Sequence, residues 1–214
     1  DPLWSRGLGD VYKRQAFVYH LDRKVEVPGM GTISIDVAWG GMAYCLVDAS
    51  SVGFTLSPDE GYELCVAAQK IKIAAIEQVP AVHPVNPDFP GITQVEFTNP
   101  LTRNADGILT AKNCVVVSPG RIDRSPCGTG TSARLAVMHA RGDIQVGERF
   151  IHESIIGTLF DSQVEELTTV GGVPAVIPSV SGQAWLTETA NVILDPTDPF
   201  PHGYTMSDTW MSIS

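Results

Sequence analysis

The amino-acid sequence predicts an α+β fold, with two main helices packed against many short strands. The helical pattern occurs twice: apolar residues recur every three or four positions within residues 57–79, and residues 133–140 are apolar at nearly every position. Short β-rich runs separated by glycine or proline fill most of the remaining chain. No repeat of fixed period occurs, which argues against solenoids and propellers. We therefore expect strands that wrap around the two helices.

The first predicted helix follows Ser57, which is placed as its capping residue. Pro58 occupies the first helical position, Asp59 and Glu60 lie in the first turn, and Pro80 marks the end. Its apolar residues form one stripe, so we expect this helix to pack one face on a sheet. The predicted strands cover residues 25–27, 31–37, 42–47, 92–98, 114–117, 149–156, 164–170, 173–180, 184–187 and 192–194.

Glycine and proline mark the predicted turns between these elements. The Gly40-Gly41 pair is interpreted as a tight turn, in preference to a bulge or to backbone that meets a ligand. Residues 83–91 form a proline-rich loop, residues 99–106 a polar loop and residues 196–201 a turn-rich tail.

The second predicted helix begins directly after a cysteine in a glycine-threonine loop. Residues 123–134 read Asp-Arg-Ser-Pro-Cys-Gly-Thr-Gly-Thr-Ser-Ala-Arg, with Cys127 at the centre. The hydroxyl of Thr129 or Thr131 is expected to cap the helix, and Gly142 to end it. Backbone N–H groups at a helix start favour an anion, and they lower the pKa of a cysteine placed there. We therefore expect a reactive thiolate beside an anion-binding site.

Other interpretations of this loop are weaker. Residues 128–133 match a dinucleotide-binding fingerprint, but the loop before them is too long and no acidic residue lies about twenty positions on within a βαβ unit. A cysteine protease would need a histidine beside Cys127, whereas His83 fits a turn and His152 fits a buried strand. An inert buried thiol is the common fate of a cysteine, but the loop and the nearby Asp123 favour a functional one. No spaced ligand cluster indicates a metal site.

The composition argues against several partner classes. The net charge is −10 without a basic cluster, which disfavours nucleic acid and anionic membrane as partners. No apolar run is long enough to span a membrane and the first residues do not resemble a signal peptide, so we expect a cytoplasmic protein. The four cysteines, Cys45, Cys65, Cys114 and Cys127, lack zinc-type spacing and are expected to be reduced.

Residues 123–134 resemble the second cysteine motif of the proline racemase family, which includes 4-hydroxyproline 2-epimerases and trans-3-hydroxyproline dehydratases. Other stretches are similar to family landmarks in the same order, namely residues 35–41, 140–142, 152–157 and 195–200. The resemblance implies a diaminopimelate-epimerase-like fold, with two pseudo-symmetric halves that each wrap a sheet or barrel around a central helix. It also implies an isomerase that uses neither pyridoxal phosphate, another cofactor nor a metal.

By this resemblance, two cysteines act from opposite sides of the substrate α-carbon, one as thiolate base and the other as thiol acid. Cys127 is one of them, Asp123 holds the substrate ammonium, and the backbone N–H groups of Gly128 and Thr129 hold its carboxylate. A threonine in place of Cys127 marks the dehydratases, so the cysteine favours a racemase or epimerase. We expect 4-hydroxyproline as the small-molecule substrate, with proline as the alternative, and a homodimer as the assembly. Gln94 stands where some epimerases carry a substrate-contacting histidine.

The resemblance also predicts the domain organisation. Residues 1–15 lack helical or strand periodicity and are expected to be foreign to the protein. Residues 31–188 are expected to form the second half-domain, which carries Cys127, and residues 16–30 and 189–214 to be remnants of the first. The first family motif, of a Met-Cys-Gly-His type, does not occur, so we expect a fragment that does not racemise alone. A noncatalytic protein that binds an imino acid or an anion is the alternative from a different class.

Overall fold

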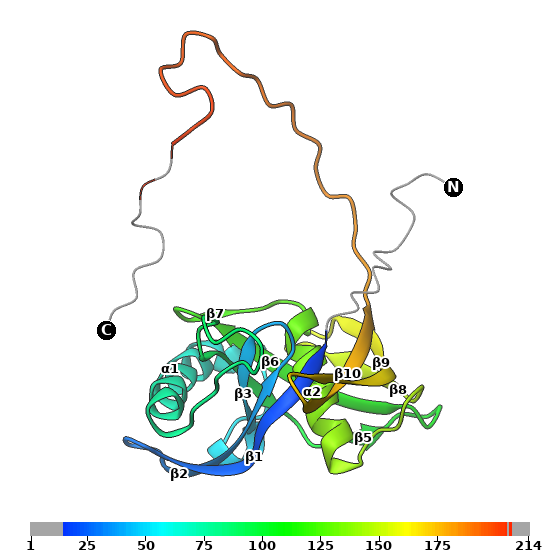
Figure 1. Ribbon diagram of the computed structural model, residues 1–214. Coiled ribbons are helices and arrows are strands. Elements are labelled where there is room, and N and C mark those ends of the chain that lie inside the picture. The colour runs from blue at the N-terminus through cyan, green and yellow to red at the C-terminus, as the bar shows by residue number, and fades with distance from the viewer. Residues whose placement is uncertain (1–14, 205, 207–214) are drawn as a thin grey trace. The chain divides into compact units, whose positions relative to one another are not determined.

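The computed structural model describes residues 15–204 and residue 206 (Figure 1). The chain divides into two units, residues 1–184 and residues 185–214, and each is considered by itself. Nearly all of the segment predicted to be foreign, residues 1–15, lies outside the described residues.

The strands of the first unit form one sheet that closes into a barrel. Neighbouring strands follow the order β4-β3-β2-β1-β10-β9-β8-β6, and β4 pairs in turn with β6, which closes the ring. The barrel strands are β1 (Ala16–Val27), β2 (Gly31–Trp39), β3 (Ala43–Asp48), β4 (Ile92–Thr98), β6 (Leu109–Val117), β8 (Arg149–Glu153), β9 (Leu159–Val170) and β10 (Val173–Ser181). Two short strands, β5 (Thr102–Arg103) and β7 (Arg121–Ile122), pair with β6.

The two helices lie on opposite sides of the barrel wall. α2 (Gly128–Arg141) is enclosed by the barrel, where it contacts β1, β2, β3, β9 and β10 (Figure 1). α1 (Gly61–Gln78) packs outside against β4, β1 and β6, as expected for an amphipathic helix. Successive side chains of a strand point to opposite faces of the barrel wall, so the same strands contact both helices. Phe97 and Cys114 belong to the outer core with α1, whereas Val115 packs with Ala133 of α2. The predicted α+β class, with a sheet wrapped around a central helix, is confirmed.

α1 begins as the sequence predicts. A short 3-10 turn, η3 (Pro58–Glu60), precedes it, and the Ser57 hydroxyl accepts a hydrogen bond from the Asp59 N–H at 3.3 Å. The Glu60 carboxylate accepts the Ser57 N–H in return at 2.9 Å, which completes a capping box. No helix among the described residues is long and apolar enough to cross a membrane.

α2 begins differently, and its predicted caps are wrong. Cys127 stands at the capping position, and no side chain caps the helix. The hydroxyl of Thr129 lies 2.6 Å from that of Tyr44, and the hydroxyl of Thr131 lies 2.9 Å from His152 Nδ1, so both predicted caps are engaged with the barrel wall. The C-terminal prediction is confirmed, because Gly142 adopts the left-handed conformation with φ 81° and ends the helix.

Gly40 brings the barrel wall into close contact with the first turns of α2. A Cβ at this position would lie 2.0 Å from the Thr129 carbonyl oxygen and 2.5 Å from the Ala133 nitrogen, so only glycine fits. The N–H of Gly40 also bonds across a turn to the carbonyl of Met42 at 3.1 Å. The turn is therefore present as predicted, and it serves in addition as the point where wall and helix meet.

β1 is longer than the predicted strand over residues 25–27. It pairs with β2 along most of its length, and with β10 at its start, where Ala16 pairs with Val176. Residues 16–27 are thus part of the barrel that encloses α2, whereas the assignment of residues 16–30 to another half-domain stays a prediction.

The second unit contains no strand among its described residues, 185–204 and 206, so the predicted strands 184–187 and 192–194 are wrong. Their β-branched residues match the composition of a strand, but a strand also needs a partner with which to pair its backbone groups. The turn-rich tail is confirmed within this unit, since Asp195 Oδ1 accepts hydrogen bonds from the N–H and hydroxyl of Thr197 at 2.8 and 2.7 Å.

Candidate functional site

Cys127 adopts a backbone conformation that is rare for any residue other than glycine. Its φ is 65° and its ψ is 117°. The Cys127 N–H donates to Ser125 Oγ at 3.0 Å, and Asp123 Oδ1 accepts from the N–H and hydroxyl of Ser125 at 2.8 and 2.9 Å. Strain of about 1–3 kcal/mol at such a position persists only where the surroundings hold it. The loop therefore fixes the direction in which Cys127 carries its thiol.

Two hydroxyl groups contact the thiol. Tyr44 Oη lies 3.3 Å from Cys127 Sγ, and Thr129 Oγ1 lies 3.7 Å from it. Tyr44 comes from β3 and Thr129 from the first turn of α2, so the barrel wall and the helix meet at the sulfur. Tyr44 is absent from the site predicted from the sequence.

Burial raises the pKa of the Cys127 thiol, which is opposite to the expected effect of the helix start. Hydrogen bonds from the Tyr44 hydroxyl, the Gly130 backbone and the Thr129 hydroxyl oppose this shift, and the charge of Asp123 adds to it. The expectation of a lowered pKa is therefore wrong for this structure, because the loss of water around the sulfur outweighs the donors. The surroundings of Cys127 therefore favour the thiol over the thiolate.

The structure brings the predicted site residues together. Asp123 is linked to Cys127 through Ser125, and Gly128 and Thr129 are the first two residues of α2. A Cβ added at Gly128 would meet nothing within 4 Å, so the space beside it is open. Apart from the Gly130 N–H, which is directed at the Cys127 sulfur, the first backbone N–H groups of α2 have no side-chain cap and are available to an anion.

Behind the loop lies a buried polar cluster that sequence reasoning missed. It comprises Glu96 of β4, Asn113 of β6 and His152 of β8, each with 0% of its surface exposed. Asn113 Nδ2 donates to the carbonyl of Pro126, the residue before Cys127, at 2.8 Å. Polar residues inside otherwise apolar strands were the available signal, but only the pairing of distant strands places them under this loop.

The other candidate residues have structural roles. His83 Nδ1 accepts the N–H groups of Val85 and Asn86 at 3.3 and 3.2 Å, which confirms a role in a turn. His152 is the buried strand histidine that was expected. All four cysteines are free thiols, as predicted, and the three other than Cys127 belong to the outer core with α1. The described residues contain no group of three side chains suited to a metal ion.

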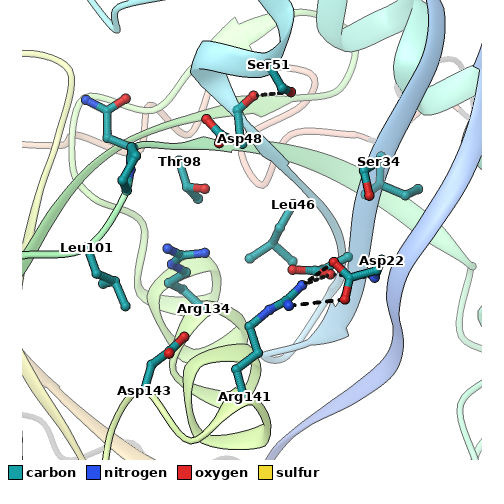
Figure 2. A pocket seen from close by; sticks show the side chains of 14 residues that line it. Asp22, Ser34, Leu46, Asp48, Ser51, Thr98, Leu101, Arg134, Arg141 and Asp143 are labelled. Atoms are coloured by element: carbon teal, nitrogen blue, oxygen red, sulfur yellow. Dashed lines mark hydrogen bonds and ion pairs between the residues drawn. The ribbon is translucent and has the colours of Figure 1, made fainter.

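The pocket in Figure 2 is separate from this site. Its volume is about 540 Å³, and neither Cys127 nor the residues next to it in sequence line it. Arg141 at its edge forms ion pairs with Asp22 and Asp36 at 2.8 and 2.7 Å. Arg134 extends from α2 into the pocket (Figure 2).

A thiol at the uncapped start of an enclosed helix is an arrangement suited to cysteine-based acid–base or nucleophilic chemistry next to a place for an anion. The sequence narrows this class further. The chain belongs to the proline racemase family, which it matches over residues 10–205. The match begins inside the segment 1–15 that was predicted to be foreign.

Two solved structures are similar to this chain. One is a probable proline racemase from Agrobacterium radiobacter K84 with bound carbonate, at 39% identity and a TM-score of 0.75. The other is a hydroxyproline epimerase from Agrobacterium vitis with bound trans-4-hydroxy-L-proline, at 38% identity and a TM-score of 0.75. Each alignment covers 92% of this chain but only 56% and 55% of the respective relatives, so the chain spans just over half of their length.

Proposed function

We propose that Cys127 is one of two proton-transferring cysteines of a cofactor-independent epimerase that acts at the α-carbon of 4-hydroxyproline. The observation that carries the proposal is the thiol at the uncapped start of α2, within contact distance of the Tyr44 and Thr129 hydroxyls. A resting thiol suits the acid that returns a proton to the α-carbon. The other three cysteines of this chain lie in the outer core, so the proposed mechanism takes its partner base from outside this chain.

The residues around Cys127 support the binding of an amino-acid substrate. The Asp123 carboxylate would hold the substrate ammonium, and the first N–H groups of α2, at Gly128 and Thr129, would hold its carboxylate. As the α-proton leaves, negative charge grows on that carboxylate. Fixed donors stabilise such charge by roughly 3–4 kcal/mol each in comparable sites.

The relatives support the choice of 4-hydroxyproline as the proposed substrate. The hydroxyproline epimerase that is 38% identical contains bound trans-4-hydroxy-L-proline, which favours the hydroxylated imino acid, and the probable proline racemase makes proline the alternative. Gln94 is buried on β4 beside Tyr44, where some epimerases carry a substrate-contacting histidine, and it is the side chain available to set this preference. A cytoplasmic homodimer belongs to the same proposal on sequence grounds.

The test uses this chain and its Cys127→Ala variant. We expect trans-4-hydroxy-L-proline to protect Cys127 from iodoacetamide at lower concentration than L-proline does. Neither compound should change its optical rotation, because inversion at the α-carbon needs a second cysteine on the opposite face. Turnover by this chain that disappears in Cys127→Ala would refute the need for a second cysteine. Equal protection by acetate would instead favour a noncatalytic anion-binding protein.

A further inference from the structure

Glu96 is a carboxyl group inside the barrel that the proposed reaction does not use. It lies on β4 with 0% of its surface exposed, and β4 pairs with β3 on one side and with β6 on the other. Burying a carboxylate costs free energy unless partners compensate, so its presence here needs a physical reason.

One side chain connects Glu96 to the peptide before Cys127. Glu96 Oε1 accepts from Asn113 Nδ2 at 3.0 Å, and the same nitrogen donates its other hydrogen to the Pro126 carbonyl at 2.8 Å. A carboxylate only accepts hydrogen bonds, so it sets the orientation of the Asn113 amide. The flipped amide would turn its oxygen toward two acceptors. Glu96 therefore holds the Pro126 carbonyl through Asn113.

The peptide held in this way is the one that gives Cys127 its unusual backbone. Its carbonyl side is fixed by Asn113, and its N–H side is fixed by Ser125 Oγ at 3.0 Å. The φ of 65° at Cys127 is maintained between these two contacts.

Glu96 also lies against the helix start itself. A Cβ on Gly130 would come within 3.0 Å of Glu96 Oε2 and 3.3 Å of Cys127 Cβ, so the carboxyl group and the cysteine flank the same glycine. Glu96 Oε2 has no hydrogen-bond partner among the described residues. In an interior shielded from water, a negative charge at Oε2 disfavours a second negative charge at Cys127 across the same glycine, and the Asp123 carboxylate acts on the thiol in the same direction.

Four other titratable groups face Glu96. His152 Nε2 lies 3.7 Å from Oε1, but burial holds the pKa of His152 well below its usual value, so the imidazole is neutral. Arg134 of α2, whose guanidinium is seen in Figure 2, is the positive charge that favours ionised Glu96. Burial, with a smaller effect of the Glu96 charge, raises the pKa of Tyr44 and Cys114. Burial raises the pKa of Glu96 itself to about 7.

We propose that Glu96 is a positioning residue for Cys127, which holds the Pro126 carbonyl through Asn113 and by its charge favours the thiol over the thiolate. The proposal rests on the proposed function for the reaction that the positioned thiol serves. It concerns the backbone of Cys127 and the balance between its thiol and thiolate forms, and both can be measured without turnover.

The first experiment measures the rate of Cys127 alkylation by iodoacetamide in this chain from pH 6 to 10, quantified on the peptide that contains it. Glu96→Gln keeps an acceptor for Asn113 and removes the charge, so we expect alkylation about tenfold faster at pH 8. In the unmodified chain the logarithm of the rate should rise by less than one per pH unit near pH 7. Glu96 ionises in this range, and its new charge disfavours the reactive thiolate as the pH rises. The slope should return to one in Glu96→Gln. Superimposable profiles would overturn the charge effect.

Thr98→Val is the matched control, since Thr98 is buried on the same strand and its hydroxyl bonds only to the Val47 carbonyl at 3.4 Å. Its alkylation profile should match that of the unmodified chain, and a tenfold change in this variant would overturn the assignment to Glu96.

The second experiment measures hydrogen exchange over residues 123–131. Glu96→Leu removes the acceptor, and we expect exchange at least about tenfold faster than in Glu96→Gln or Thr98→Val. Equal exchange in the three variants would overturn the positioning role, and Glu96→Gln decides the charge effect even where Glu96→Leu fails to fold. Neither readout requires turnover, so both can succeed while the imino-acid protection test fails, which would overturn the proposed function alone.

Discussion

The two helices of this protein start in opposite ways. α1 continues from the capped 3-10 turn η3, in which the Ser57 hydroxyl accepts the Asp59 N–H and the Glu60 carboxylate accepts the Ser57 N–H. At α2 no side chain does so, and Cys127 stands at the capping position with a strained backbone. A helix start that is closed by its own side chains serves stability, whereas one that is left open can receive a ligand.

The pKa values of the glutamates near the two helix starts are shifted in opposite directions. Partial burial of Glu60 is outweighed by hydrogen bonds from the backbone N–H groups of Ser57 and Thr55, which hold its pKa below the usual value. Burial of Glu96, only partly offset by Asn113 and Arg134, raises its pKa to about 7. The contrast predicts that ionised Glu96 costs stability at neutral pH, whereas ionised Glu60 does not.

The largest expected effect concerns the contact between the wall and α2. Gly40→Ala places a Cβ 2.0 Å from the Thr129 carbonyl, so we expect a loss of at least about 3 kcal/mol in the free energy of unfolding. Gly61→Ala at the start of α1 is the control, because its Cβ would meet only Ile122 Cδ1, at 3.4 Å, and alanine favours a helix. Urea denaturation measures both variants. Equal losses of unfolding free energy in the two variants would show that the contact at Gly40 is no tighter than the start of α1.

The pH dependence of stability comes next in size. Since the folded pKa of Glu96 is raised from 4.5 to about 7, its contribution is fully present below pH 4.5 and is lost as pH rises through 7. The shift corresponds to about 3 kcal/mol as an upper estimate. The difference in unfolding free energy between the unmodified chain and Glu96→Gln should therefore change over this range and stay constant above pH 8. A difference that is independent of pH would show that Glu96 keeps an ordinary pKa.

A smaller effect is expected from the strain at Cys127. Glycine adopts a φ of 65° without a steric penalty, so Cys127→Gly should be about 1 kcal/mol more stable than Cys127→Ala. Both variants lose the contacts of the sulfur, and their difference in denaturation midpoint isolates the backbone. An alanine variant that is the more stable of the two would show that the loop relaxes when the thiol is removed.

The smallest expected effect is at the closed helix start. Ser57→Ala should cost about 1 kcal/mol, and Ser57→Gly only a few tenths, because glycine is tolerated at a capping position. Thermal unfolding of the two variants is the measurement. A Ser57→Ala variant of unchanged stability would mean that the capping box does not contribute.

Much of this architecture follows from local sequence. The helix ends at Ser57 and Gly142, the alternation of the barrel strands and the position of Cys127 depend on neighbours in the chain, and these predictions are confirmed. The strands predicted at residues 184–187 and 192–194 are wrong because composition alone does not supply a partner strand.

The inner surroundings of Cys127 depend on distant pairings. Tyr44 and Glu96 reach the loop because β3 pairs with β4 in parallel and β4 with β6, and no local pattern specifies these pairings. The same contacts explain the wrong caps, since the wall residues take the hydroxyls of Thr129 and Thr131. The pKa of Cys127 could not be predicted for a related reason, because burial by the barrel decides its direction.

The order of the elements along the chain determines when the barrel around α2 can form. Strands β1 to β6 precede the helix and β8 to β10 follow it, and the wall closes where Ala16 pairs with Val176. The helix is therefore not threaded into a finished barrel but walled in by segments synthesised after it. The apolar cluster around Cys127 draws its wall residues from β1, β2, β3 and β6, which are synthesised before the helix. Val176 of β10 packs instead with Leu135, Ala136 and Met138 farther along α2, so the second half of the helix is the part whose cover is synthesised last.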